Sequence, residues 1–296
     1  MSHDQSRMWS SGAGSAALPA PAKGTGTPPG AHRGSAIRDS FGTTERKDNW
    51  WLQPLAQAVG LGLLGLYATW AALQGNHFLY EGGGAHYLSP FYSPTLRPSW
   101  LPDWVSPALL ILWAPAGFRT TCYYYRKAYY RAFFADPVAC AVGEPRKGYM
   151  GEKSFPFILQ NVHRYFLYVA LLFLIVLWYD VYKAFTFDGR FGIGLGSLAI
   201  LASTGLLTLY TFSCHSLRHI VGGRIDCFSC AVAGGPQRQT WSWVSLLNER
   251  HMAWAWWSLL AVCAADFVVR MLSMGVFQDI VFFPWTLFNS AGPVGL

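Results

Sequence analysis

The chain has 296 residues, of which 52% are hydrophobic and only 12% are charged. Soluble globular domains carry about 25% charged residues, so this composition indicates a membrane protein. The formal net charge is +7, and the six cysteines are few and irregularly spaced, which excludes a disulfide-rich secreted scaffold. The basic residues are placed in the segments between apolar stretches, so we expect a lipid bilayer and not nucleic acid as the partner of this charge.

The chain begins with a polar stretch. Residues 1–48 are rich in Gly, Ser, Ala and Pro and have no apolar periodicity, so they predict a disordered tail. Trp50 and Trp51 follow, and paired tryptophans are typical of a membrane interface. We therefore divide the chain into a flexible tail, 1–48, and a membrane anchor domain, 49–296.

Five stretches are apolar over about 20 residues, the length that a helix needs to cross the hydrocarbon core. They lie near 54–74, 104–126, 162–184, 191–217 and 250–276. The sequence therefore predicts an all-α membrane protein with five transmembrane helices. The Gly-, Pro- and aromatic-rich loop 75–103 is expected to form an irregular cap on the membrane surface.

The lysines and arginines are distributed asymmetrically between the two sides that five alternating helices would create. One side receives six of them before residue 54, eight from Arg119 to Arg164 and four from Arg218 to Arg250, whereas the other side receives four. Because cytoplasmic loops carry the excess of positive charge, this predicts an N-in/C-out, multi-pass protein of the cytoplasmic membrane.

Charged residues also occur inside the predicted spans. Asp266 and Arg270 are four residues apart, and we interpret them as a self-neutralised pair near a helix end. Arg119 lies within the second span, where it is either functional or long enough to reach the interface with its side chain.

The strongest motif lies where the fourth predicted span ends. His215 and His219 are four residues apart, so on a helix they share one face, and Cys227 and Cys230 form a CxxC turn soon after. Imidazole and thiolate are strong metal ligands, and this spacing predicts that the four side chains share a metal centre. Cys214 is an alternative ligand, although its position on the helix favours a packing role against another helix.

The ligand types do not identify the metal. A structural Zn(II) site accepts two Cys and two His, whereas a Rieske-type [2Fe-2S] cluster takes two Cys on one iron and two His on the other. His163 and His251 open two further predicted helices on the same side, and they are candidates for axial ligands of haem b or for a quinone site.

Several stretches resemble the membrane-anchor C subunit of the type 1 succinate dehydrogenase of actinobacteria. They are "GFRTTCYYYRKAYYRAFF", "FPFILQNVHRYFLYVA", "LWYDVYKAF", "SCHSLRHIVGGR" and "NERHMAWAWWSL", within residues 49–276. The resemblance implies an anchor that docks the iron-sulfur subunit, which in turn binds the FAD flavoprotein subunit, on the cytoplasmic face. A small single-helix membrane subunit is also considered as a partner.

The same resemblance implies electron transfer to a membrane quinone, usually menaquinone, through a membrane-embedded Rieske-type [2Fe-2S] cluster. Carried onto this chain, the cluster ligands become His215, His219, Cys227 and Cys230. We place the quinone in a cleft between the third, fourth and fifth predicted spans. Its candidate contacts are His163, Arg164, Tyr165, His251, Trp254 and Arg119.

Two other functions remain open from the sequence. The first is a quinone-reactive b-type cytochrome, which would carry haem. The second is a membrane scaffold without redox activity, which a structural zinc site would stabilise. No nucleotide loop, catalytic triad or carboxylate pair is present, so we expect the chain to act as a subunit of succinate:quinone oxidoreductase and not as an independent enzyme.

Overall fold

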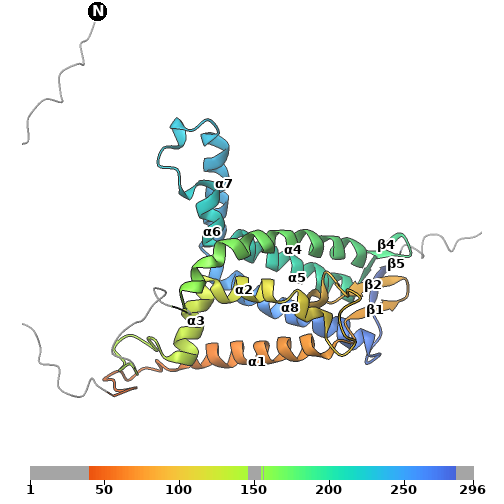
Figure 1. Cartoon of the computed structure of the whole chain (residues 1–296), viewed down its shortest axis with the longest axis horizontal. Coiled ribbons are helices and arrows are strands. Elements are labelled where there is room, and N and C mark those ends of the chain that lie inside the picture. The colour runs from red at the N-terminus through yellow and green to blue at the C-terminus, as the bar shows by residue number, and fades with distance from the viewer. Residues whose placement is uncertain (1–39, 146–154, 156, 285–296) are drawn as a thin grey trace, which may run out of the picture. The chain divides into compact units, whose positions relative to one another are not determined.

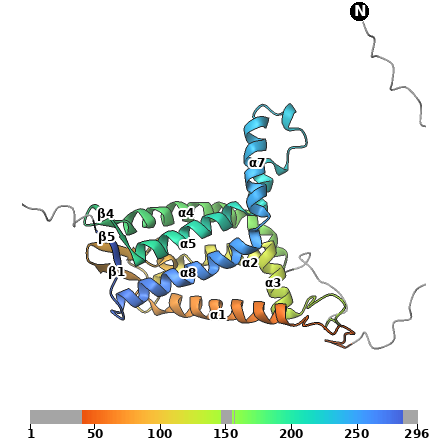
Figure 2. The ribbon, with the colours of Figure 1, turned by 180° about the vertical axis from the view of Figure 1, so that it is seen from behind.

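Four long helices lie side by side and form the body of the protein (Figures 1 and 2). This computed structural model describes residues 40–145, 155 and 157–284. The four helices are α1 (Leu52–Gln74), α4 (His163–Ala184), α5 (Leu195–Phe212) and α8 (His251–Ser273). The packing between α5 and α8 is the most extensive, and α4 packs on α5.

These four helices are long and apolar enough to span a bilayer. The span that contains α4 begins before that helix and runs from Ile158 to Ala184. Their outward faces carry large apolar side chains, as at Leu66 and Ile175, which are 72% and 68% exposed. Without water to satisfy backbone groups in a membrane, helices with such faces are the stable solution. The protein is therefore an integral membrane protein built mainly of helices.

The second predicted span, 104–126, is not one continuous helix. It contains the 3₁₀ helix η3 (Pro107–Leu110) and α2 (Trp113–Thr121), and α3 (Tyr123–Phe134) follows at once. The break lies at Cys122, whose backbone is extended with φ −63° and ψ 131°. Among the described residues, four helices and not five meet the length and hydropathy expected of a span.

The expectation of helices alone misses two small sheets at one end of the body. β1 (Leu79–Gly82) and β2 (Ala85–Leu88) form a hairpin within the predicted cap, with Tyr80 opposite Tyr87. Gly83 and Gly84 allow its tight turn because both have positive φ, 58° and 80°. The second sheet has the order β3 (Thr186–Phe187), β4 (Arg190–Gly194) and β5 (Val281–Pro284), all antiparallel.

The other end of the body carries α3, the start of α4 and a projecting segment (Figure 1). That segment contains α6 (His215–Arg218), the π-helix η6 (His219–Gly223), the 3₁₀ helix η7 (Phe228–Cys230) and α7 (Gly234–Asn248). The 3₁₀ helices η2 (Pro90–Tyr92) and η5 (Phe157–Val162) complete the elements. We call the end of the body that carries α3, the start of α4 and the projecting segment the cysteine end. Residues 1–39 of the predicted tail lie outside the described residues. Closer to α1, Gly42 and Thr43 form backbone hydrogen bonds with Gly143.

A buried ion pair ties three segments together near the opposite end. Asp266 and Arg270, 0% and 1% exposed, contact each other at 3.3 Å within α8. The Tyr67 hydroxyl of α1 donates to the Asp266 carboxylate at 2.7 Å, and Ser89 donates to its other oxygen. Arg270 also donates to the Asn76 carbonyl at 2.9 Å. The pair is thus structural, as its spacing predicts, and every charge is compensated.

We expect Asp266→Ala to destabilise the protein by about 3–5 kcal/mol, because it leaves the Arg270 guanidinium buried without a counter-charge. The measurement is the thermal unfolding of the purified complex. Asp103→Ala is the control, since Asp103 pairs with Arg97 on the exposed surface and its loss should barely move the midpoint. Equal midpoints for the two variants would contradict the structural role.

Candidate metal centre

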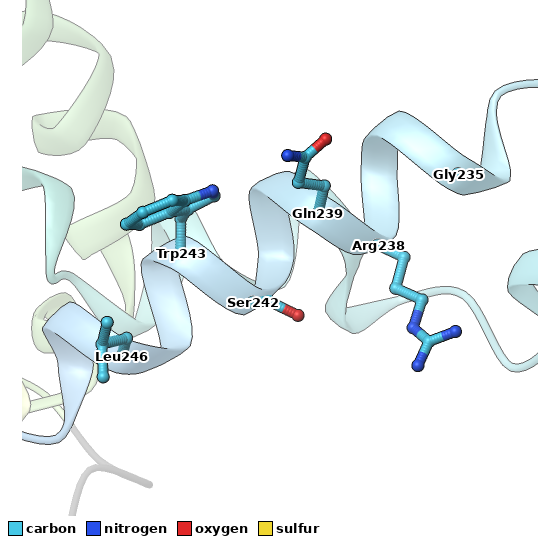
Figure 3. A pocket seen from close by; sticks show the side chains of 6 residues that line it. All are labelled: Gly235, Arg238, Gln239, Ser242, Trp243 and Leu246. Carbon is cyan, nitrogen blue, oxygen red and sulfur yellow. The ribbon is translucent and has the colours of Figure 1, made fainter.

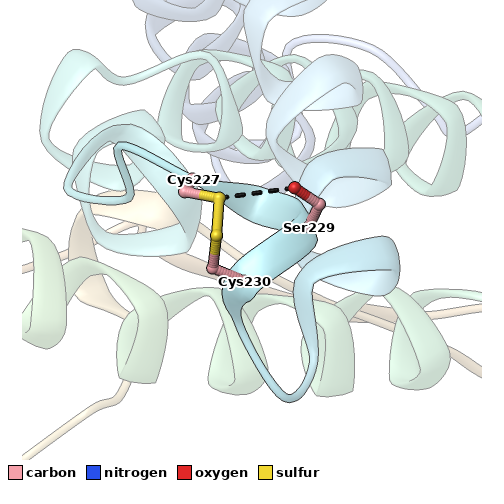
Figure 4. Close-up of a disulfide and its surroundings, with 3 residues drawn as sticks. All are labelled: Cys227, Ser229 and Cys230. Carbon is pink, nitrogen blue, oxygen red and sulfur yellow. Dashed lines mark hydrogen bonds between the residues drawn. A yellow bond between two sulfur atoms is a disulfide. The ribbon is translucent and has the colours of Figure 1, made fainter. Parts of the chain in front are cut away.

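The predicted ligands Cys227 and Cys230 are bonded to each other. A disulfide joins them within the projecting segment, between η6 and α7, with their Cα atoms 5.3 Å apart (Figure 4). Ser229 lies between them, and its Oγ is 3.3 Å from the Cys227 sulfur. In this state neither cysteine offers a thiolate to a metal.

The two predicted histidine ligands lie in different surroundings. His215 is the exposed first residue of α6, and His219 receives a hydrogen bond at Nδ1 from Arg164 Nη2 at 3.0 Å. The structure therefore does not gather His215, His219, Cys227 and Cys230 at one point, and this ligand set stays a prediction. Within the described ranges, no three His, Cys, Asp or Glu side chains surround a position for a single metal ion.

A different set of two thiols and two imidazoles meets inside the cysteine end. The Cys122 sulfur lies 3.4 Å from His251 Nε2, and the Cys214 sulfur lies 3.2 Å from His163 Nε2. Both cysteines are buried and belong to one hydrophobic cluster of the core, which also contains Tyr210. We call Cys122, His163, Cys214 and His251 the buried Cys/His set.

The backbone explains why these residues converge. Cys122 separates α2 from α3 and Cys214 precedes α6, and both have an extended backbone, with ψ 131° and 136°. His163 and His251 are the first residues of α4 and α8. Two helix breaks and two helix starts therefore meet at the same end of the body.

The residue before each cysteine orients a histidine. Thr121 Oγ1 donates to the Gly117 carbonyl at 2.6 Å, so its lone pairs accept from His163 Nδ1, 2.9 Å away. This fixes the proton of His163 on Nδ1 and leaves the lone pair of Nε2 for the Cys214 thiol.

The second half of the site repeats this arrangement. Ser213 Oγ donates to the Tyr210 carbonyl at 2.9 Å and accepts from His251 Nδ1 at 2.7 Å. The Nε2 lone pair of His251 is then directed at Cys122. A ring nitrogen held by an oxygen acceptor, with the other nitrogen facing a ligand position, is the arrangement that metal-binding histidines adopt.

Aromatic rings enclose the buried Cys/His set. Phe118 stacks on His163 with ring centroids 4.8 Å apart, and Tyr210 stacks on His251 at 5.1 Å. Burial raises the pKa of the Cys214 thiol, which lies beyond the last residue of α5, to about 11. At neutral pH this thiol is therefore protonated and donates to His163.

The other residues predicted to contact a quinone are divided between the interior and the surface. Arg119 is partly buried and donates to the Tyr125 hydroxyl at 2.6 Å and to Ser258 Oγ at 3.2 Å. Trp254 Nε1 donates to the Leu247 carbonyl. Arg164 is exposed and Tyr165 is 69% exposed, so these two do not share a cleft with the imidazoles.

A cavity of about 430 Å³ lies between the helices next to the buried Cys/His set. Its walls are apolar and come from α1, α2, α4, α5 and α8, and Arg119 is its one charged lining residue among those described. Phe118 also lines it, and the same ring stacks on His163. A more open hollow lies along α7, where Arg238 and Trp243 point outward (Figure 3).

The family model for the actinobacterial succinate dehydrogenase subunit SdhC matches residues 52–275. The chain belongs to this SdhC family. A solved structure, the Mycobacterium smegmatis Sdh1 complex in the apo form, contains a similar chain with 41% identity and a TM-score of 0.74. The match covers 81% of this chain and 94% of that chain. No curated protein matches the sequence.

Membership of the SdhC family makes the chain a membrane subunit of succinate dehydrogenase, as its sequence predicts. Sequence reasoning missed Cys122 and the pairing of the histidines with buried cysteines. The sequence does contain a signal for both. Thr121-Cys122 precedes His163, with 41 residues from the cysteine to the histidine, and Ser213-Cys214 precedes His251, with 37 residues. In both cases the cysteine ends an apolar stretch and the histidine begins a helix.

We expect the buried cysteines to resist alkylation while the fold is intact. A maleimide should label the exposed Cys140 quickly but leave Cys122 and Cys214 unlabelled, as read by mass spectrometry of tryptic peptides. Denaturant should make all three reactive. Labelling of Cys122 at the rate of Cys140 in the folded protein would show that the site is open.

Proposed function

We propose that this subunit anchors succinate dehydrogenase in the membrane and relays its electrons to a quinone, menaquinone by resemblance. The partners in this proposal are the iron-sulfur subunit and the FAD flavoprotein subunit, on the cytoplasmic face. The similar chain of known structure belongs to the Mycobacterium smegmatis Sdh1 complex, which supports an assembly of this kind. The docking side would be the cysteine end, where the projecting segment and α3 lie.

The observation that carries the relay is the buried Cys/His set. A Rieske-type [2Fe-2S] cluster takes two Cys on one iron and two His on the other, and the set has this composition. Cys122 and Cys214 would hold one iron, and His163 and His251 the other. When bound, such a cluster accepts and passes on one electron at a time.

The arrangement favours a two-iron cluster over a single zinc ion. Zinc in a structural site needs four ligands around one point, whereas each iron of a [2Fe-2S] cluster needs only two from the protein. The part of the chain that the structure describes offers no three-ligand point, but it offers two thiols and two imidazoles in one buried region. Axial haem ligation is less supported, because each Nε2 faces a thiol.

The chain's own residues supply the rest of the site. Thr121 and Ser213 hold the imidazole rings by their Nδ1 atoms, so the Nε2 lone pairs are available without a change of tautomer. Phe118 and Tyr210 cover the rings and exclude water. Cysteine binds metals as thiolate, so the two thiol protons leave when the site is loaded.

The cavity beside this set has the character of a quinone site. Its apolar walls suit an isoprenoid tail, and Arg119 can donate a hydrogen bond to a quinone oxygen. The neighbouring Phe118 lines the same cavity and stacks on His163. A quinone ring at Arg119 would lie one aromatic ring away from the proposed cluster. Of the predicted quinone contacts, we therefore retain Arg119 and assign His163 and His251 to the cluster.

We expect Cys122→Ser and Cys214→Ser each to remove the cluster. Iron and acid-labile sulfide should fall by two atoms each per complex, and the reduced-state EPR signal of a His-ligated cluster should disappear. Quinone reduction should be lost, whereas succinate oxidation with a soluble artificial acceptor should persist, because the clusters of the iron-sulfur subunit remain.

The double variant Cys227→Ser, Cys230→Ser is the matched control, and it should keep the signal and the sulfide. Loss of the cluster in this control but not in the buried variants would establish the ligand set predicted from the sequence instead. Zinc in place of iron and sulfide in the unmodified complex would overturn the relay.

A second prediction tests the cavity. Ala170→Phe fills it from α4 and should lower kcat/KM for quinone about tenfold, equivalent to ~1.4 kcal/mol, without changing turnover with a soluble acceptor. Leu172→Phe adds a ring on the same helix but at a position that is 63% exposed, so quinone kinetics should stay unchanged. The same loss in both variants would refute a quinone site in this cavity.

A further inference from the structure

Helix α7 runs crosswise to the four long helices. Figures 1 and 2 show it leaving the body at the cysteine end and extending sideways beyond it. It ends at Asn248, and α8, one of the four helices of spanning length, begins at His251. Because spanning helices run roughly along the bilayer normal, α7 lies along the membrane surface, at the level where α8 enters the bilayer.

One face of α7 is occupied by the rest of the projecting segment. Val244 is buried, and the Trp241 ring lies 6.1 Å from the ring of Phe228 in η7. Arg218 Nε donates to Ser245 Oγ at 2.8 Å, and its guanidinium covers the Trp241 ring. These contacts fix the rotation of α7 about its own axis, so they also determine which side chains face away.

The opposite face of α7 is open and carries two large apolar side chains. Trp243 and Leu246 are 63% and 57% exposed, and they lie in the half of α7 that leads into α8. A shallow hollow follows this face, and its lining residues recur every three or four positions: Gly235, Arg238, Gln239, Ser242, Trp243 and Leu246 (Figure 3). We call these six residues the α7 stripe. It has one basic residue, and α7 contains no acidic residue.

The α7 stripe faces the side on which lipid lies. In both views the chain that connects η6 to α7 lies on the side of α7 away from the body, so the stripe opposite it is turned toward the level of the long helices. Tyr165, in the first turn of α4, and Trp257, in the second turn of α8, are exposed at this end of the body. Such rings form the aromatic belt at a membrane interface. The α7 helix therefore leaves the body at the depth of the lipid headgroups.

We propose that α7 is an interfacial helix that binds the phospholipid leaflet at the cysteine end. Trp243 and Leu246 insert at the boundary between headgroups and acyl chains, and Arg238 binds a lipid phosphate. A soluble subunit would approach the projecting segment from the opposite side, so we assign lipid and not protein to the α7 stripe. This inference goes beyond the proposed relay and does not depend on it.

The test places the photo-crosslinker p-benzoylphenylalanine at position 243 of the whole complex, reconstituted in nanodiscs of phosphatidylglycerol and phosphatidylcholine. After irradiation, mass spectrometry of this subunit should show an adduct with the mass of a phospholipid. The matched control has the crosslinker in place of Val232, which is fully exposed in the chain between η6 and α7 and should capture no lipid. The crosslinker in place of the outward-facing Ile175 of α4 verifies that lipid is captured in the nanodisc.

The outcomes separate lipid from protein as the occupant of the α7 stripe. A crosslink from position 243 to another subunit would assign the stripe to a protein partner and overturn the proposal. Equal lipid yields at positions 232 and 243, or no adduct at 243 while position 175 captures lipid, would overturn it as well. Succinate oxidation with a soluble acceptor should be the same in all variants, because none of these positions belongs to the proposed electron path, and this activity verifies assembly.

Arg238→Gln tests the charge contribution in the same nanodiscs. An arginine near an anionic surface should enrich phosphatidylglycerol among the adducts at position 243 about fivefold over its share of the lipid, and this variant should lose the enrichment. Arg97→Gln is the control, because Arg97 pairs with Asp103 outside the projecting segment and its loss should leave the enrichment unchanged. The same enrichment with and without Arg238 would overturn the phosphate contact.

Discussion

The site depends on two interruptions of helical backbone at the same end of the body. If the helix continued through Cys122, α2 and α3 would share one axis. The extended backbone at Cys122 instead lets α3 run in a new direction, and the thiol is buried in the core. The same conformation at Cys214 redirects the chain after α5. Because each cysteine follows a hydroxyl residue, each break supplies one sulfur and one acceptor for an imidazole. Two breaks therefore provide everything that two histidines need in order to be held and paired.

The long helices make this arrangement rigid without contributing to its chemistry. Their outward faces match lipid, and the interior pairs at the opposite end, centred on Asp266, fix α1 and the hairpin segment against α8. A buried charge that is fully compensated restricts sliding of one helix along another, since any other register would leave a charge unpaired. The register of α8 is thereby set so that its first residue, His251, reaches Cys122.

The sequence predicts the helices much better than it predicts the site. Apolar runs of spanning length identify α1, α4, α5 and α8, but hydropathy does not register the extended backbone at Cys122, so the second span is predicted as one helix. The spacing of His215, His219, Cys227 and Cys230 favours a local centre because residues close in sequence can be placed without knowing the fold. The buried set comes from four segments separated by tens of residues, and only helix packing brings them together. His163, His251 and Cys214 are still recognisable as unusual from the sequence, although not as members of one group.

Arg119 connects the surroundings of the buried Cys/His set with the apolar cavity. Arg119 touches the ring of Tyr210 on one side and lines the apolar cavity on the other, and its hydrogen bonds to Tyr125 and Ser258 fix it there. In the proposed relay, a single fixed cation of this kind would stabilise negative charge on either neighbour, the cluster or the quinone. Since the cation is shared, it favours reduction of both without favouring one strongly over the other. The difference between them must then come from groups that touch only one of the two partners.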